Sequence, residues 1–170
     1  MAKKILMVIA KEKFRDEEYL ETRQALVEGG VEVKIASTEL GEAQGMFGAT
    51  ANVDLLIQDV NVKDFDGVAF IGGGGIVPLV NDERLKKLAL DFYKDEDKLV
   101  TAICAAPAIL ANVGILKDKK ATAYSGMVET IKEGGAIYNG NQVEVDGRII
   151  TADGPLSARR FGEEIVKGLR

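Results

Sequence analysis

The residue with the most evident chemistry in this chain is Cys104, its only cysteine. It follows residues 99–103 (Leu-Val-Thr-Ala-Ile), an apolar run that predicts a short buried strand. Pro107 predicts the first turn of a helix, because its ring fixes φ and its missing N–H is not needed there. Cys104 is therefore expected in a nucleophile elbow, a sharp strand-to-helix turn where unpaired N–H groups and the helix dipole favour the thiolate. The alternative is that Cys104 is a small hydrophobic residue of the core.

The chain contains no histidine. This excludes Cys–His and Ser–His–Asp catalysis, metal sites with histidine ligands and proton transfer through imidazole. Any acid–base chemistry must use carboxylates, tyrosine, lysine, water or the thiol itself. We expect no metal and no cofactor.

A glycine-rich segment is expected beside Cys104. Residues 72–75 are four consecutive glycines that follow the apolar residues 68–71, and such a loop lets a ligand approach backbone N–H groups closely. A plain tight turn is an equally good interpretation of the local sequence. Because loops at the carboxyl ends of neighbouring parallel strands converge, we expect Gly72 and Gly73 to lie next to Cys104.

Three acidic residues, Asp16, Glu17 and Glu18, begin a predicted helix after the apolar residues 5–10, a predicted strand parallel to the two above. The start of this helix is therefore expected beside Cys104 as well. Carboxylates favour helix N-termini, which accounts well for two of the three. A third carboxyl turned inward could meet the sulfur of Cys104. Burial would raise its pKa there and let it exchange a proton with the reacting centre.

Length and composition limit the kinds of protein that this chain can be. With 170 residues, 46% of them hydrophobic, we expect one domain, residues 1–170, with one well-buried core. The net charge of −5 and the absence of a basic cluster make nucleic acid an improbable partner. The apolar residues 5–10 are too few for a signal peptide or a membrane span, so we expect a cytoplasmic protein without a membrane partner.

Hydrophobic periodicity predicts an α/β fold. A strand at residues 5–10, a helix at 16–29 and a strand at 31–35 form a β-α-β unit with a right-handed crossover. We expect a doubly wound, flavodoxin-like, mostly parallel sheet with helices on both faces. The other expected elements are an irregular segment at 38–61 with a short strand at 53–57, strands at 68–71 and 99–103, helices at 79–93 and 155–169, and a hairpin at 142–150.

Four motifs together give the chain a resemblance to the PfpI/ThiJ superfamily, which includes deglycases and intracellular proteases. They are residues 14–18 (Phe-Arg-Asp-Glu-Glu), 71–73 (Ile-Gly-Gly), 102–107 (Ala-Ile-Cys-Ala-Ala-Pro) and 145–155 (Val-Asp-Gly-Arg-Ile-Ile-Thr-Ala-Asp-Gly-Pro). The resemblance covers essentially the whole chain. It implies a homo-oligomer, either a dimer or a hexamer.

The resemblance also implies a role for individual residues. Cys104 would be the nucleophile, and Glu18 would be the acid in contact with it. The backbone N–H groups of Gly73 and Ala105 would bind an oxyanion. Members of the superfamily are peptidases, glyoxalases, deglycases, chaperones or sensors of oxidative stress.

The chain departs from the superfamily pattern at three positions. The protease branch has histidine directly after the nucleophile, where this chain has Ala105. The glyoxalase branch has a histidine where this chain has Tyr124, which we consider a possible substrate-orienting residue or an ordinary packed tyrosine. Many relatives carry an arginine where this chain has Asp153. The missing histidine after the nucleophile argues against peptide hydrolysis, and the other departures argue against efficient glyoxalase activity.

The sequence therefore predicts a cysteine-dependent enzyme in which the Cys104 thiolate adds to a small reactive carbonyl compound or to its protein adduct. Glu18 would act as the acid and base in this glyoxalase-like or deglycase-like reaction. The alternative is a redox-responsive stress protein in which Cys104 is oxidised and there is little turnover. Peptidase activity is a weaker third hypothesis.

Overall fold

The computed structural model describes residues 1–170 and contains a seven-stranded main sheet with strand order β6-β3-β1-β7-β8-β10-β9. Every neighbouring pair is parallel except β10 and β9, which form the antiparallel hairpin at one edge. The strands are β1 (Lys4–Val8), β3 (Glu32–Ser37), β6 (Leu55–Leu56), β7 (Gly67–Phe70), β8 (Leu99–Ile103), β9 (Val143–Asp146) and β10 (Ile149–Ala152). The predicted mostly parallel, flavodoxin-like sheet is confirmed.

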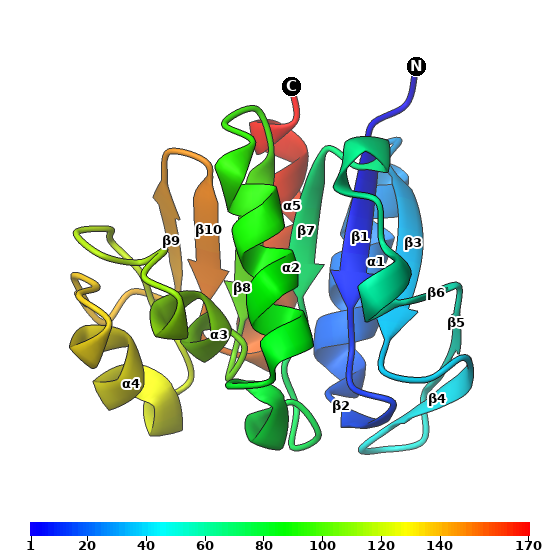
Figure 1. Cartoon of the computed structure of the whole chain (residues 1–170), viewed down its shortest axis with the longest axis horizontal. Coiled ribbons are helices and arrows are strands. Elements are labelled where there is room, and N and C mark those ends of the chain that lie inside the picture. The colour runs from blue at the N-terminus through cyan, green and yellow to red at the C-terminus, as the bar shows by residue number, and fades with distance from the viewer.

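Helices cover both faces of this sheet, and the side chains of β1 show why. Ile5 and Met7 pack against α1 and α5, whereas Leu6 and Val8 point to the opposite face, against α2 and α3. Both faces are apolar, as a buried parallel sheet requires. Figure 1 shows α2 in front of the sheet and α1 and α5 behind it. The helices are α1 (Asp16–Glu28), α2 (Glu83–Lys94), α3 (Pro107–Asn112), α4 (Val128–Glu133) and α5 (Ala158–Gly168).

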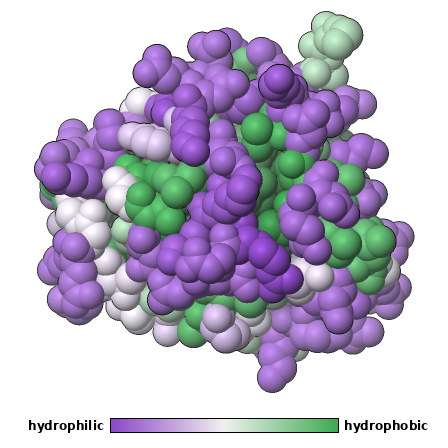
Figure 2. Space-filling model, in the orientation of Figure 1, coloured by the Kyte–Doolittle hydropathy of each residue, from purple (hydrophilic) through white to green (hydrophobic).

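The surface seen from the α2 side is mostly hydrophilic, with smaller hydrophobic areas between the charged side chains (Figure 2). None of the helices combines the length and the apolar character needed to cross a membrane.

Helices α1 and α5 approach each other closely because α5 has a glycine at the contact. A Cβ atom at Gly162 would lie 2.7 Å from the Cβ of Ala25 and 2.9 Å from the carbonyl oxygen of Thr22. The hydroxyl of Thr22 donates a hydrogen bond to the carbonyl oxygen of Ala158 at 3.3 Å. This contact fixes the middle of α1 relative to the first half of α5.

A second, three-stranded sheet lies in a region that the sequence predicted wrongly. Residues 38–61 were expected to be irregular with one strand at 53–57, but they form β4 (Gly41–Gly45) and β5 (Thr50–Val53) before β6. The expected strand at 53–57 is divided between the end of β5, β6 and a 3-10 turn. Strand β4 pairs with β2 (Glu12–Phe14), which lies inside what was expected to be a plain loop, and β5 pairs with β4. Their polar, glycine-containing sequences conceal them, because hydrophobic periodicity is the main strand signal.

Two predicted helices begin later than the sequence indicated. The helix expected at 79–93 starts as α2 at Glu83, where the Asp82 side chain accepts a hydrogen bond from the Arg84 N–H at 2.8 Å. This N-cap defines the start more sharply than the apolar pattern does. The helix expected at 155–169 begins with a 3-10 turn, and α5 starts at Ala158.

A matched pair of substitutions on α1 tests the packing. Leu26 is fully buried between α1 and the sheet, and Leu20 on the same helix is 49% exposed. Leu26→Ala is expected to lower the free energy of unfolding by about 2–5 kcal/mol, because it leaves a cavity in the core. Leu20→Ala is expected to cost less than about 1 kcal/mol. Urea denaturation of both variants checks this, and equal costs would contradict the packing described here.

Candidate functional site

Cys104 lies in a strained turn directly after β8. Its φ is +66°, in the left-handed region that residues with a Cβ seldom adopt. The Cys104 N–H donates to the carbonyl oxygen of Ala152 at 2.9 Å, and its own carbonyl oxygen accepts from the Tyr124 N–H at 2.8 Å. Helix α3 begins at Pro107, as predicted. The neighbouring strand β10 and the segment before α4 therefore hold a conformation that costs on the order of 1–3 kcal/mol.

Glu18 meets Cys104 over a glycine. The Glu18 side chain is fully buried, and its Oε1 accepts a hydrogen bond from the Gly72 N–H at 2.9 Å. A Cβ atom at Gly72 would lie 2.6 Å from both the Cys104 Cβ and the Glu18 Oε1. The missing side chain thus makes room for the carboxyl and the cysteine at one point. The other carboxyl oxygen, Oε2, is buried without a hydrogen-bond partner.

The two groups affect each other's protonation. Burial raises the pKa of the Glu18 carboxyl to about 7. Burial also raises the pKa of the Cys104 thiol to about 12, with the negative charge of Glu18 as the second cause. The expectation that the helix terminus makes Cys104 a ready thiolate is therefore wrong as it stands, because burial and Glu18 outweigh the backbone N–H groups. The pair titrates as a unit.

Two backbone N–H groups interact with the Cys104 sulfur. The N–H groups of Gly73 and Ala105 donate to no carbonyl oxygen of the chain, and both lower the pKa of the Cys104 thiol against the larger effect of burial. Gly73 has a φ of +116°, a conformation that glycine permits. Such paired donors suit an oxygen that gains negative charge in a reaction.

A cavity of about 300 Å³ opens above Cys104. Tyr124 lines it and is 41% exposed, and its ring lies against Gly126, where a Cβ would collide with the phenol. Asp153 also lines the cavity and accepts a hydrogen bond from the Ser157 hydroxyl at 2.7 Å. The structure thus brings Glu18, Gly73, Cys104, Ala105 and Tyr124 together at the carboxyl edge of the sheet (the lower edge in Figure 1).

Sequence reasoning missed three residues that line this cavity, namely Arg15, Met46 and Val77. Met46 comes from the unpredicted hairpin between β4 and β5. Arg15 directly precedes α1 within the 14–18 motif, and its position beside the acidic first turn was the available signal.

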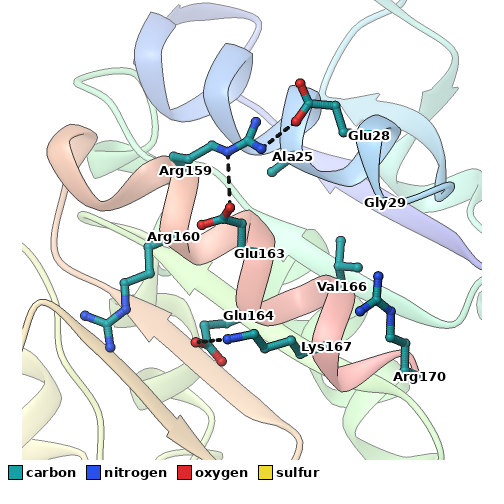
Figure 3. A pocket seen from close by; sticks show the side chains of 10 residues that line it. All are labelled: Ala25, Glu28, Gly29, Arg159, Arg160, Glu163, Glu164, Val166, Lys167 and Arg170. Carbon is teal, nitrogen blue, oxygen red and sulfur yellow. Dashed lines mark hydrogen bonds and ion pairs between the residues drawn. The ribbon is translucent and has the colours of Figure 1, made fainter.

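A larger cavity lies elsewhere, between α1 and α5, with a volume of about 420 Å³. Figure 3 shows that its three carboxylates are paired, because Arg159 pairs with Glu28 and Glu163, and Lys167 pairs with Glu164, whereas Arg160 and Arg170 form no ion pair. No thiol and no buried carboxyl without a hydrogen-bond partner faces it. No group of three His, Cys, Asp or Glu side chains that could hold a metal ion occurs in the structure.

Comparison with known proteins identifies the family of this chain. Residues 3–168 match the sequence profile of the DJ-1/PfpI family. The chain belongs to the DJ-1/PfpI family. It is 34% identical over 167 residues to the deglycase PfpI of Pyrococcus furiosus, covering 98% of this chain and 99% of that protein. It is 43% identical over 169 residues to the uncharacterized protein MJ0967 of Methanocaldococcus jannaschii, covering 98% of this chain and 82% of that one.

Solved structures of the DJ-1/PfpI family share the fold closely. A ThiJ/PfpI domain protein from Brachyspira murdochii superimposes with a TM-score of 0.96 at 36% identity, over 99% of this chain and 96% of that one. DJ-1beta of Drosophila melanogaster superimposes with a TM-score of 0.88 at 27% identity, over 99% of this chain and 91% of that one. The resemblance seen in the sequence motifs is thereby confirmed.

The raised pKa of Glu18 makes a prediction about stability. The ordinary pKa of a glutamate carboxyl is 4.5, and that of Glu18 in the folded chain is about 7. Between these two pH values the unfolded chain releases the Glu18 proton, whereas the folded chain keeps it. The folded state then binds more protons, so this group makes the free energy of unfolding fall as pH rises, by at most about 1.4 kcal/mol per pH unit. Glu18→Gln is expected to remove this contribution.

Urea denaturation at several pH values between 5 and 7 measures that slope. Glu21→Gln, which removes an exposed carboxyl from the same helix, is the matched control and is expected to keep the wild-type slope. Identical slopes in the wild type and Glu18→Gln would show that Glu18 is not held neutral by burial.

Proposed function

We propose that this protein is a cysteine-dependent enzyme that acts on small reactive carbonyl compounds, in the manner of a glyoxalase or deglycase. The observation that carries the proposal is the meeting of a buried carboxyl, Glu18, with Cys104 beside two free backbone N–H groups. This arrangement supplies a nucleophile, a proton donor and an oxyanion site within one cavity.

The first step follows from these positions. The Cys104 sulfur attacks an aldehyde carbon, so that a C–S bond forms while the electrons of the carbonyl π bond move to oxygen. The N–H groups of Gly73 and Ala105 stabilise that oxygen, and the Glu18 carboxyl gives it a proton, which yields a hemithioacetal. For methylglyoxal, the Glu18 carboxylate then moves a proton from the former aldehyde carbon to the neighbouring carbon, while the hydroxyl proton of the hemithioacetal passes to the former ketone oxygen, which yields a thioester. Hydrolysis of the thioester C–S bond by one water releases lactate and returns the thiol. The net reaction adds one water and needs no external oxidant.

The shared proton sets the pH at which this step begins. Below about pH 7 both the Glu18 carboxyl and the Cys104 thiol are protonated, and above it the pair holds one proton. Attack requires that this remaining proton be on Glu18 and the charge on sulfur. The raised pKa of the Glu18 carboxyl favours this state, because it increases the fraction of pairs in which the shared proton is on Glu18 and not on the Cys104 sulfur.

The names of relatives support an enzymatic role in this direction. Several archaeal relatives are named deglycases, including that of Pyrococcus furiosus. A relative from Bacillus subtilis, 32% identical, is named a putative cysteine protease. The absence of histidine in this chain removes the usual base of a cysteine peptidase, so carbonyl chemistry is the better candidate here.

One observation favours a second candidate, a redox-responsive role. The Glu18 Oε2 is buried without a partner near the half-buried Cys104. A protonated Glu18 could donate a hydrogen bond to an oxygen added to the sulfur, which would stabilise a sulfinate. A relative of 34% identity is named general stress protein 18.

Turnover and thiol reactivity should share one pH dependence. We expect the lower limb of the methylglyoxal pH–rate profile to coincide with the pH dependence of Cys104 alkylation by iodoacetamide. Glu18→Gln should move both together to higher pH, because the step near pH 7 belongs to the Glu18–Cys104 pair and the lone thiol keeps the pKa increase that burial causes. Tyr124→Phe should lower the rate without moving either.

Cys104→Ala is expected to abolish this turnover. If alkylation and turnover titrate apart, or if Cys104→Ala keeps its activity, Cys104 is not the nucleophile.

Oxidation distinguishes the two candidate functions. With limiting peroxide, intact-mass spectrometry is expected to show oxygen added at Cys104 before the four methionines are modified. Glu18→Leu should slow this oxidation or shift the product to over-oxidised forms, because no carboxyl remains to hold the first product. Methionine oxidation with an unmodified thiol would count against the redox role, whereas oxidation without carbonyl turnover would favour it.

A further inference from the structure

The Cys104 cavity has opposite charges on its two flanks. The order of the strands β1-β7-β8-β10 in the sheet places these charges. Arg15 follows β2, the short strand after β1, and Asp153 follows β10. Gly73 and Cys104 lie between them, because they follow β7 and β8. A cation therefore lies on the flank of the oxyanion donors, and a carboxylate lies on the opposite flank. Arg15 is the only lysine or arginine that lines the cavity.

Arg15 is held in place from several sides. Its backbone N–H donates to the carbonyl oxygen of Gly72 at 3.0 Å, next to the proposed oxyanion site. Its Nε donates to the Glu17 carboxylate, and its guanidinium lies over the Phe47 ring at 5.0 Å from the centroid. Phe47 is carried by the β4–β5 hairpin, whose turn is fixed by Asp16, since the carboxylate of Asp16 accepts the Phe47 N–H at 3.0 Å.

These contacts leave the two terminal nitrogens of the Arg15 guanidinium without a hydrogen-bond acceptor. The two terminal nitrogens, Nη1 and Nη2, donate to no atom of the chain, although the side chain is only 31% exposed. The pKa of Arg15 is raised, first by its hydrogen bond to Glu17 and also by the charges of Glu18 and Cys104, so its charge acts on the reacting groups. A fixed guanidinium with two free N–H-bearing nitrogens suits a planar carboxylate.

We infer that Arg15 forms a carboxylate-binding subsite, and that the preferred substrates are small aldehydes that carry a carboxylate beside the carbonyl, with glyoxylate as the simplest probe. The carboxylate would bind Arg15 while the carbonyl oxygen occupies the N–H groups of Gly73 and Ala105. The Cys104 sulfur then forms a C–S bond, and the oxygen takes its proton from Glu18. The adduct is a reversible hemithioacetal, with no change of oxidation state. The substrate class rests on the proposed function, whereas the anion preference of the cavity does not.

Two alkylating reagents of nearly equal size test the anion preference. Cys104 is the only cysteine, so the rate of alkylation by anionic iodoacetate or neutral iodoacetamide reports on this cavity alone. The ratio of the iodoacetate rate to the iodoacetamide rate is expected to exceed that of 2-mercaptoethanol, even though the chain's net charge of −5 repels anions. Arg15→Gln should lower the ratio about fivefold.

The control is Arg23→Gln, which removes the same charge from an exposed position on α1 outside the cavity and should leave the ratio nearly unchanged. Arg15→Lys should give an intermediate ratio, because it keeps the charge and loses the planar fork. If the Arg15 variants do not fold, the wild-type ratio against 2-mercaptoethanol decides. A wild-type ratio no higher than that of the free thiol, or equal effects of Arg15→Gln and Arg23→Gln, overturns the subsite.

Protection experiments test the substrate class. Glyoxylate is expected to slow iodoacetamide alkylation of Cys104 at lower concentration than glyoxal does, and Arg15→Gln should weaken glyoxylate protection while leaving glyoxal protection unchanged. Equal protection by both in the wild type contradicts the carboxylate preference. If the wild type does not turn over methylglyoxal but its ratio of iodoacetate to iodoacetamide rates exceeds that of 2-mercaptoethanol, the proposed enzyme function is refuted and the carboxylate-binding subsite is supported.

Discussion

The contact of the buried Glu18 carboxyl with Cys104 across Gly72 is the constraint on which the site depends. Three chain segments, the start of α1 and the ends of β7 and β8, must converge where a single methyl group would not fit. The close packing of α1 on α5 and the parallel pairing of β7 with β8 meet that requirement together. The site is thus a consequence of the main sheet and its rear helices, and the smaller sheet contributes only Arg15 and Met46, which directly follow its strands β2 and β4, to the cavity wall.

Burial at this contact works against charge on both groups. A carboxyl with a pKa of about 7 lowers stability at neutral pH relative to a solvated carboxyl, whereas a thiol with a pKa of about 12 lowers stability only above its ordinary value of 9.0. Backbone N–H groups offset part of that cost at sulfur, and the strained turn at Cys104 adds to it. Such unfavourable arrangements persist where the surrounding fold imposes them, and they are concentrated at functional sites.

Much of the fold could be predicted from local sequence. The apolar runs that became β1, β7 and β8 are long enough and hydrophobic enough to specify buried parallel strands, and Pro107 correctly placed the start of α3. The convergence of Gly73 and Cys104 followed from topology alone, because parallel strands bring their carboxyl ends to one edge. The polar second sheet could not be found in this way. Its strands pair through the backbone, which leaves little trace in hydrophobic pattern.

What the sequence by itself determined is therefore the residue types present, the absence of imidazole, and the strand-to-helix elbow that presents the only thiol. The tertiary structure decided which acid faces inward. Asp16 turns to the β4–β5 hairpin, Glu17 to Arg15, and Glu18 to Gly72, a contact between residues 54 positions apart. It also decided the protonation of Cys104, because desolvation depends on the neighbours that folding assembles around a group. Periodicity and motif spacing describe single segments, whereas burial and charge coupling arise only when separate segments meet.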